Sequence, residues 1–283
     1  GQRILVTGRA DQVVQVEDLN QVALNLDYVQ ERHLVGGVEI CTSRGCIHRC
    51  TFCNIIGRES YQARSSENTI QLLKRYHQRY TAIFGDRIPP NAWRLHIADD
   101  DFACDKPRAA QFFQDLLKTP FRLSSVQVSV ADLCRKEGGK LLPELEPELC
   151  DYIIPECFAD HAKRLPIIDY IEDHKPRNWS SYLQIGVETF CDKELVRLGK
   201  GYRVEHIRRV VDEMAAKQIH LDAYFIQSNS ETTAEELLES LIELVRLKIK
   251  HPVYFHVRYP PVPHLVSYFP AATHRRHIRK DKA

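Results

Sequence analysis

Six short runs of apolar and β-branched residues recur along the chain, and a longer amphipathic segment separates each run from the next. Each run is apolar almost throughout rather than at alternate positions, which is typical of a strand covered on both faces. Strands that alternate with helices in this way form parallel βα units. The predicted strands are residues 37–42, 93–98, 124–130, 182–188, 221–227 and 253–259.

The segments between these strands carry helix signals. The first predicted helix follows serines that can cap it and stops before Gly85, and the last begins at a capping box formed by Thr233 and Glu236. The others have apolar positions at helical spacing. Besides the helix that the capping box opens, we expect helices over residues 67–84, 107–117 and 204–217.

One gap is longer than a simple crossover needs. Residues 132–180 separate the third and fourth strands, and a plain crossover takes about half that length. We therefore expect a helix and an inserted helical excursion there. The chain then divides into an N-terminal segment, a core that contains the insertion, and a C-terminal extension with a basic tail. Their bounds are residues 1–35, 36–260 and 261–283.

Composition limits the classes of function. The chain has 39 Lys and Arg against 38 Asp and Glu, a formal net charge of +1, which argues against a protein that coats nucleic acid and gives no specific nucleic-acid signal. No apolar stretch approaches the ~20 residues of a membrane-spanning helix, and no signal peptide is evident. We expect a cytoplasmic protein with no membrane contact. The only methionine is Met214, so we expect the segment before residue 36 to be the tail of an upstream domain.

The nine cysteines are unevenly spaced, and Cys46, Cys50 and Cys53 form C-x3-C-x2-C directly after the first predicted strand. Three thiolates on one short loop can bind three irons of a four-iron four-sulfur cluster and leave the fourth iron without a protein ligand. The alternative is a zinc site completed by Cys41 or His48. We expect His48 and Arg49 to face solvent, and Cys150 and Cys157 to pack in the interior.

The sequence around these cysteines resembles the radical S-adenosylmethionine (SAM) superfamily. Its hallmark is C-x3-C-x2-C with an aromatic residue before the last cysteine, here Phe52. The flanks CTSRGC and RSSEN, the acidic ADDDF, and the later QIGVET and RLGKG resemble the branch that often carries an N-terminal cobalamin-binding domain. The resemblance implies an open (β/α)6 partial TIM barrel.

The resemblance also implies roles for individual residues. Cys46, Cys50 and Cys53 would ligate the cluster, and Asp99, Asp100, Glu188 and Phe52 would lie against SAM. A helix cap or a solvated turn is the alternative for the three aspartates that begin at Asp99. The loop after the fifth strand reads QSNSET where the family has G-x-P-G-E-T, so its geometry is expected to differ.

The expected activity is reductive cleavage of SAM to a 5′-deoxyadenosyl radical that modifies an unactivated carbon, by methylation or another carbon-centred transformation. Cobalamin-dependent methylation is one form of this activity. A reductant such as flavodoxin or ferredoxin and an unidentified substrate would be the partners. No cobalamin signature is present, so if cobalamin is used, its binding domain would precede Gly1; the alternative is that the protein has lost cobalamin binding. The alternatives are a cobalamin-free oxidoreductase, epimerase or cyclase, and a non-catalytic iron-sulfur or zinc scaffold.

Overall fold

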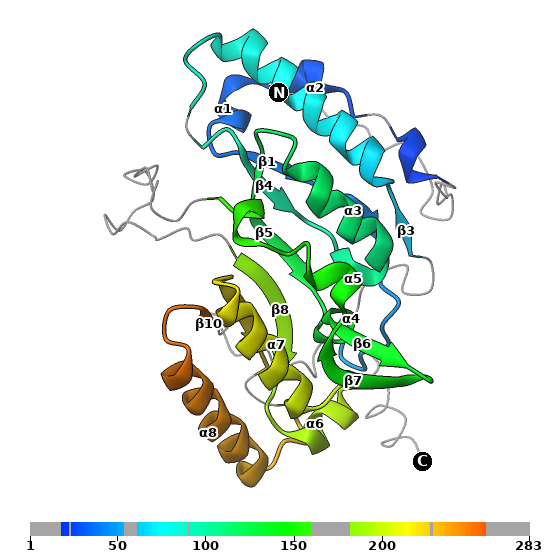
Figure 1. The fold of residues 1–283 in the computed structure, drawn as a ribbon, viewed down its shortest axis with the longest axis vertical. Coiled ribbons are helices and arrows are strands. Elements are labelled where there is room, and N and C mark those ends of the chain that lie inside the picture. The colour runs from blue at the N-terminus through cyan, green and yellow to red at the C-terminus, as the bar shows by residue number, and fades with distance from the viewer. Residues whose placement is uncertain are drawn as a thin grey trace, which may run out of the picture.

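A six-stranded parallel sheet forms the centre of the computed structural model, which describes residues 18–22, 24–53, 61–89, 91–159, 182–226 and 229–258. All six predicted strands are present, and they lie in the sheet in the order in which they occur in the chain (Figure 1). The strands are β1 Val38–Ile40, β4 Arg94–Ile97, β5 Arg122–Val128, β8 Tyr182–Glu188, β9 Leu221–Phe225 and β10 Phe255–Arg258.

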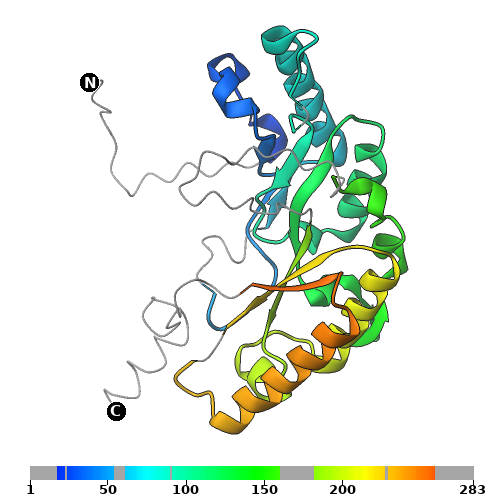
Figure 2. The same ribbon diagram turned by 90° about the vertical axis from the view of Figure 1, so that its left-hand side faces the viewer.

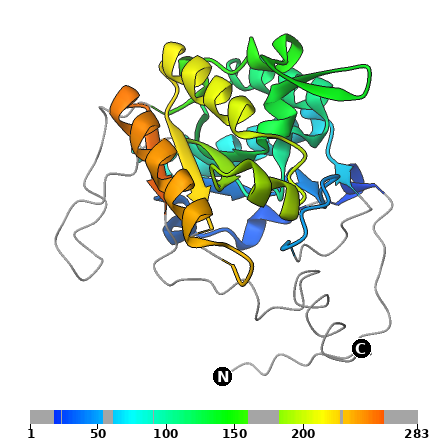
Figure 3. The ribbon, with the colours of Figure 1, turned by 90° about the horizontal axis from the view of Figure 1, so that it is seen from below.

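The main helices cover one face of this sheet. Each strand joins the sheet next to the strand before it in the chain, and crossovers between parallel strands are right-handed. Together these two facts place the connecting helices on one face of the sheet and curl the sheet around its other face. Figure 2 shows these helices on one side of the strands, and Figure 3 shows them as an arc outside the strands. They are α2 Ser66–Phe84, α3 Lys106–Leu116, α7 Val204–Ala216 and α8 Ala234–Lys250.

The expected helix caps are confirmed. The side chain of Ser65 accepts a hydrogen bond from the N–H of Asn68, and Gly85 ends α2 with a φ of 57°. Thr233 and Glu236 form the capping box at the start of α8. The open sheet and its helical layer match the predicted (β/α)6 partial barrel, and the described strands do not close into a complete barrel.

The described part of the insertion contains a β-hairpin that we did not predict. Strand β6, Cys134–Glu137, pairs antiparallel with β7, Lys140–Leu145, and Gly138 and Gly139 connect them with positive φ values of 55° and 79°. Two adjacent glycines suit a two-residue turn whose twist matches that of the strands. The helical elements around the hairpin are short: α4 Val130–Leu133, α5 Pro147–Cys150 and η4 Pro155–Cys157.

The remaining short elements lie near the N-terminus, in the segments that follow β1 and β4, and directly after β8. They are η1 Leu19–Gln21, η2 Leu26–Tyr28, α1 Glu31–Leu34, β2 Ser43–Arg44, β3 Gln62–Ala63, η3 Phe102–Cys104 and α6 Asp192–Arg197. Residues 1–17, about half of the expected upstream tail, and the extension from 261 onward lie outside the described residues. No helix of the described part is both long and apolar enough to cross a membrane.

The entry into β1 gives the first prediction. Gly37 has a φ of +106°, and a Cβ there would lie 2.4 Å from the carbonyl oxygen of Arg94 on the neighbouring strand. We expect Gly37→Ala to lower the free energy of unfolding by about 2 kcal/mol or more, because the strained φ and the clash both oppose folding. Gly36→Ala is the matched control, since nothing lies within 4 Å of its added Cβ. Equal urea stability of the two variants would contradict this reading.

Candidate active site at the carboxyl edge of the sheet

The residues selected from the sequence meet at the carboxyl edge of the sheet. The cysteine loop follows β1, Asp99–Asp101 follow β4, Asp132 lies in α4 directly after β5, and Glu188 is the last residue of β8. These four strands are successive neighbours in the sheet. Parallel α/β folds place their sites at this edge, because the loops that follow the strands converge there.

The cysteine loop is held at both ends and in the middle. Strands β2 and β3 pair antiparallel and close the loop at its base. Near its centre, the N–H of Thr51 donates to the carbonyl oxygen of Leu198 at 2.8 Å, and its Oγ1 donates to that of Arg197 at 2.9 Å. The turn that contains Gly199 therefore serves as a support for the loop. A Cβ on Gly199 would come within 3.1 Å of the carbonyl oxygen of Arg49.

Asp99 is a buried junction between β4 and the cysteine loop. Its carboxylate accepts four hydrogen bonds, from the N–H and hydroxyl of Thr42 at 2.5 Å each, and from those of Ser43 at 3.0 and 2.8 Å. The guanidinium of Arg108 lies 3.8 Å from the same carboxylate and donates to the Thr42 hydroxyl at 2.9 Å. Only 5% of Asp99 is exposed, so its carboxylate orients the start of the loop.

The other two aspartates lie in different surroundings. The carboxylate of Asp100 is half-buried and accepts one hydrogen bond from the N–H of Gly45 at 2.9 Å. Asp101 caps the short helix η3 through the N–H of Ala103 at 3.2 Å and is buried. The capping alternative for this acidic turn is therefore realised at Asp101.

We expected His48 to face solvent, but its ring faces two carboxylates instead. Its Nε2 lies 2.8 Å from the carboxylate of Asp132 and 3.3 Å from that of Asp101. Burial lowers the pKa of this imidazole, but hydrogen bonds to the two carboxylates raise it to about 11, so the ring is protonated at neutral pH. Burial also raises the pKa of Asp101 to about 7, against the effect of His48. Arg49 is exposed, as predicted.

The thiols of the loop differ in their surroundings. A hydrogen bond with Cys104 lowers the pKa of Cys46 to about 6, burial opposes this, and the N–H of His48 assists it from 3.4 Å. The Cys46 sulfur is therefore mainly thiolate near neutral pH, the form that binds metals. Burial raises the pKa of Cys50, although Lys200 lowers it. Cys104 was not among the predicted site residues.

Glu188 forms a buried ion pair with Lys200. The Nζ of Lys200 lies 3.0 Å from Oε1 of Glu188 and 5.5 Å from the ring centroid of Phe52, which belongs to the cysteine loop. The backbone of Glu188 has a φ of 68°, unusual for a residue other than glycine. A Cβ on Gly186 would lie 2.7 Å from the Glu188 carboxylate, so the glycine leaves room for the pair.

Lys200 was missed as a site residue, although it lies in the quoted RLGKG motif. Burial lowers the pKa of its ammonium, but the nearby Tyr202 and Glu188 raise it above the ordinary value, so Lys200 is charged. The lysine thus brings together the end of β8, the RLGKG turn and Phe52.

The loop after β9 is anchored to α6. Thr232 donates from Oγ1 to the buried carboxylate of Glu194 at 2.5 Å, and the amide of Asn229 donates to the same oxygen at 2.8 Å. Gln227 and Ser228, which carry part of the departure from the family motif, lie outside the described residues. Cys150 and Cys157 are buried in the core, as expected.

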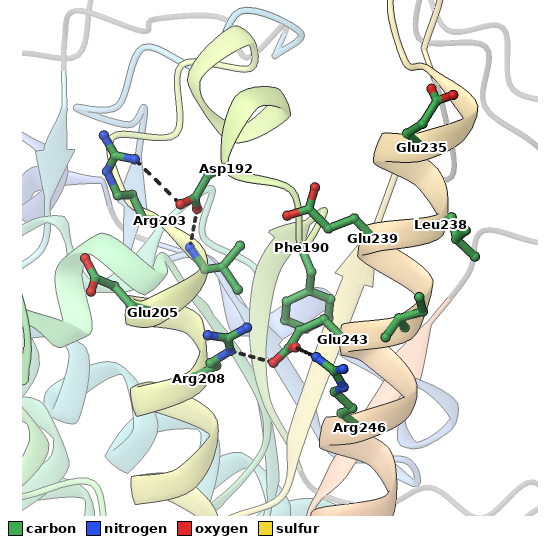
Figure 4. Close-up of a pocket in the computed structure, with 12 residues that line it drawn as sticks. Phe190, Asp192, Arg203, Glu205, Arg208, Glu235, Leu238, Glu239, Glu243 and Arg246 are labelled. Atoms are coloured by element: carbon green, nitrogen blue, oxygen red, sulfur yellow. Dashed lines mark hydrogen bonds and ion pairs between the residues drawn. The ribbon is translucent and has the colours of Figure 1, made fainter.

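A groove of about 920 Å³ lies in the outer layer between α7 and α8 (Figure 4). Five of the charged residues that line it form ion pairs: Glu243 lies 2.5 Å from Arg208 and 3.6 Å from Arg246, and Asp192 lies 3.6 Å from Arg203. None of the cysteine loop residues lines it. The Arg208–Glu243 pair joins the two helices, and the groove is separate from the site at the strand ends.

The Glu188–Lys200 ion pair predicts that substitutions at these two residues have strongly coupled effects on the free energy of unfolding. Lys200→Met leaves the buried Glu188 carboxylate without its cation, and we expect this to lower the free energy of unfolding by about 3–5 kcal/mol. The double variant Glu188→Gln/Lys200→Met removes both charges and should cost less than Lys200→Met alone. Urea unfolding of the two single variants and the double variant measures the coupling. Additive losses would show that the pair does not interact.

A third prediction concerns the support of the loop, where Arg197 donates two hydrogen bonds to Glu236 at 2.8 and 2.5 Å. This pairing lowers the pKa of Glu236 from its ordinary 4.5 to about 2. Because the folded-state pKa is the lower one, the stabilisation is complete above pH 4.5 and is lost as pH falls toward 2. We expect Glu236→Gln to be less stable than wild type at pH 7, with a gap that narrows at pH 3. A gap independent of pH would argue against the ion pair.

No protein-family model matches the chain, and no curated protein matches its sequence. Solved structures match its fold. One is the cobalamin-dependent S-adenosylmethionine radical enzyme OxsB with aqua-cobalamin and S-adenosylmethionine bound, at a TM-score of 0.62 and 19% identity over 87% of this chain and 36% of OxsB.

Another is the radical S-adenosylmethionine methyltransferase TsrM from Kitasatospora setae with tryptophan substrate and a SAM analogue bound. Its TM-score is 0.51, at 13% identity over 76% of this chain and 35% of TsrM. The chain thus spans about a third of the length of the proteins it matches. At these identities the likeness shows the fold, and that fold is the one of radical SAM enzymes, as the sequence motifs implied.

Proposed function

We propose that this chain is the catalytic core of a radical SAM enzyme, with a four-iron four-sulfur cluster on Cys46, Cys50 and Cys53. The observation that carries the proposal is the C-x3-C-x2-C loop, which is anchored at the carboxyl edge of a sheet with the radical SAM fold. When bound and reduced, such a cluster supplies the electron that cleaves SAM into methionine and a 5′-deoxyadenosyl radical.

The residues present fit such a cluster. Three thiols lie on one loop that hydrogen bonds hold at its base and centre, and Cys46 has a pKa of about 6. Thiolates are the ligands of iron-sulfur clusters. Burial raises the pKa of the Cys50 thiol, and the ammonium of Lys200 opposes this rise and so favours negative charge on the cluster side of the loop.

We assign the SAM contacts by the groups that keep free hydrogen-bonding capacity. Within the described residues, the Asp100 carboxylate accepts one hydrogen bond, so it can accept more from the SAM ammonium. Lys200 has three N–H donors, can reach the SAM carboxylate while paired with Glu188, and packs on Phe52. Asp99 accepts four hydrogen bonds already, which favours a positioning role for it.

The reaction that we propose is modification of an unactivated carbon, and the candidates are ranked in an order that places cobalamin-dependent methylation first. Both matched enzymes support this order, because one is cobalamin-dependent and the other is a methyltransferase that has also been solved with cobalamin and a [4Fe-4S] cluster bound. A cobalamin-free oxidoreductase, epimerase or cyclase is the second candidate. Corrinoid binding by the full-length protein distinguishes the two.

The electron would come from a small reductant such as flavodoxin or ferredoxin. All nine cysteines are free thiols, which suits a reducing compartment, and we propose the cytoplasm. A measurement of SAM cleavage distinguishes this enzyme from an iron-sulfur scaffold without SAM chemistry.

The direct test is formation of 5′-deoxyadenosine after anaerobic cluster reconstitution, with dithionite and SAM. We expect wild type to form it and Cys50→Ala to form less than about one hundredth as much, because the cluster loses a ligand. Cys41→Ala is the matched control, since Cys41 lies just before the loop and donates only to the carbonyl oxygen of Ala98 at 3.4 Å. The Cys41→Ala variant should still bind the cluster and form as much 5′-deoxyadenosine as wild type.

Two results would contradict the proposal. A colourless protein that binds zinc through Cys41 and the three cysteines would identify a structural zinc site. A brown protein that never cleaves SAM would identify a scaffold.

A further inference from the structure

A second set of metal-binding groups shares one residue with the cysteine triad. The Sγ atoms of Cys46 and Cys104, Nε2 of His48 and a carboxylate oxygen of Asp101 all lie within 4.8 Å of one another. Two of these side chains belong to the cysteine loop and two to the segment after β4. The sequence separates the two pairs by about fifty residues, so their spacing gives no motif.

The donor set is that of a four-coordinate transition-metal site. Two thiolates, an imidazole and a carboxylate are all common zinc ligands, and zinc prefers four of them in a tetrahedron. Bond lengths of about 2.1 Å to nitrogen and oxygen place those two atoms about 3.4 Å apart in a tetrahedron. The Nε2 of His48 and the Asp101 carboxylate are 3.3 Å apart.

The four groups are held by contacts outside the set. Asp101 is fixed by its cap on η3, and the neighbouring Asp100 ties the loop through Gly45 at 2.9 Å. The carboxylate of Asp132 lies 2.8 Å from the same His48 nitrogen, so a cation bound there would face two carboxylates. Cys46 and Asp101 are buried, and His48 and Cys104 are partly buried. An ion that binds here displaces the proton by which His48 bonds to the two carboxylates and the thiol proton that Cys104 shares with Cys46, so binding releases protons and strengthens as pH rises.

We propose that Cys46, His48, Asp101 and Cys104 bind one divalent transition-metal ion of the zinc class in the cluster-free protein. Since Cys46 belongs both to this set and to the cluster triad, the ion and the cluster exclude each other. Binding of the ion stands on the geometry alone, whereas the competition rests on the proposed function. The site would make cluster assembly sensitive to free zinc.

Cobalt is the probe for the site, because its visible spectrum reports tetrahedral geometry and thiolate ligands. We expect the cluster-free full chain to bind one Co²⁺ with thiolate charge-transfer bands. Cys104→Ser should lose about half of the charge-transfer intensity and weaken binding by about tenfold or more. Cys53→Ser is the matched control, because Cys53 belongs only to the triad, and it should leave the spectrum and the affinity unchanged. Asp101→Asn, a second variant that keeps the side-chain size, should also weaken binding.

Competition is then measured by reconstitution with and without one equivalent of Zn²⁺. Zinc should slow cluster formation in wild type and not in Cys104→Ser. Absence of Co²⁺ binding, or loss of it in Cys53→Ser but not in Cys104→Ser, would overturn the proposed site. Failure of wild type to assemble a cluster without zinc would contradict the proposed function, while the cobalt titration still decides the metal site.

Discussion

The carboxylate of Asp99 is the constraint on which the rest of the site depends. It joins the end of β4 to the residues that follow β1, and it accepts hydrogen bonds from both the backbone and the hydroxyls of Thr42 and Ser43. A buried carboxylate is costly unless its oxygens are fully paired, so this arrangement permits little movement. The cysteine loop begins within a few residues of this point. Its position relative to the sheet is therefore set before any cofactor binds.

Two further buried charges extend this constraint across the carboxyl edge. Protonated His48 links the loop to Asp101 and to Asp132, and Lys200 links Glu188 to Phe52. Each contact joins the loop to elements that follow β4, β5 or β8. Because a buried charge without its partner costs several kcal/mol, these pairs favour one arrangement of the loop. The site is thus organised by charged residues that lie at or after the carboxyl ends of four successive strands.

Much of the fold could be predicted from local pattern, because continuous apolar runs and helix caps such as Ser65 and Thr233 act through near neighbours. The hairpin around Gly138 and Gly139 was missed, although adjacent glycines are a turn signal, because the charged strands that flank them lack an apolar run. The cysteine spacing indicated the loop. The partners of His48 and Cys46 could not be predicted from the sequence. Asp132 lies 84 positions from His48, and Cys104 comes close to Cys46 because β4, which precedes it, pairs with β1 in the sheet.

The central claim is that three cysteines bind a cluster whose fourth iron is open to SAM. Electron paramagnetic resonance of the reconstituted, dithionite-reduced protein tests it most directly. The account predicts a four-iron four-sulfur signal whose g values change when SAM is added, because SAM binds at the open iron. A signal that SAM leaves unchanged would show that all four irons are already ligated, and it would contradict the account.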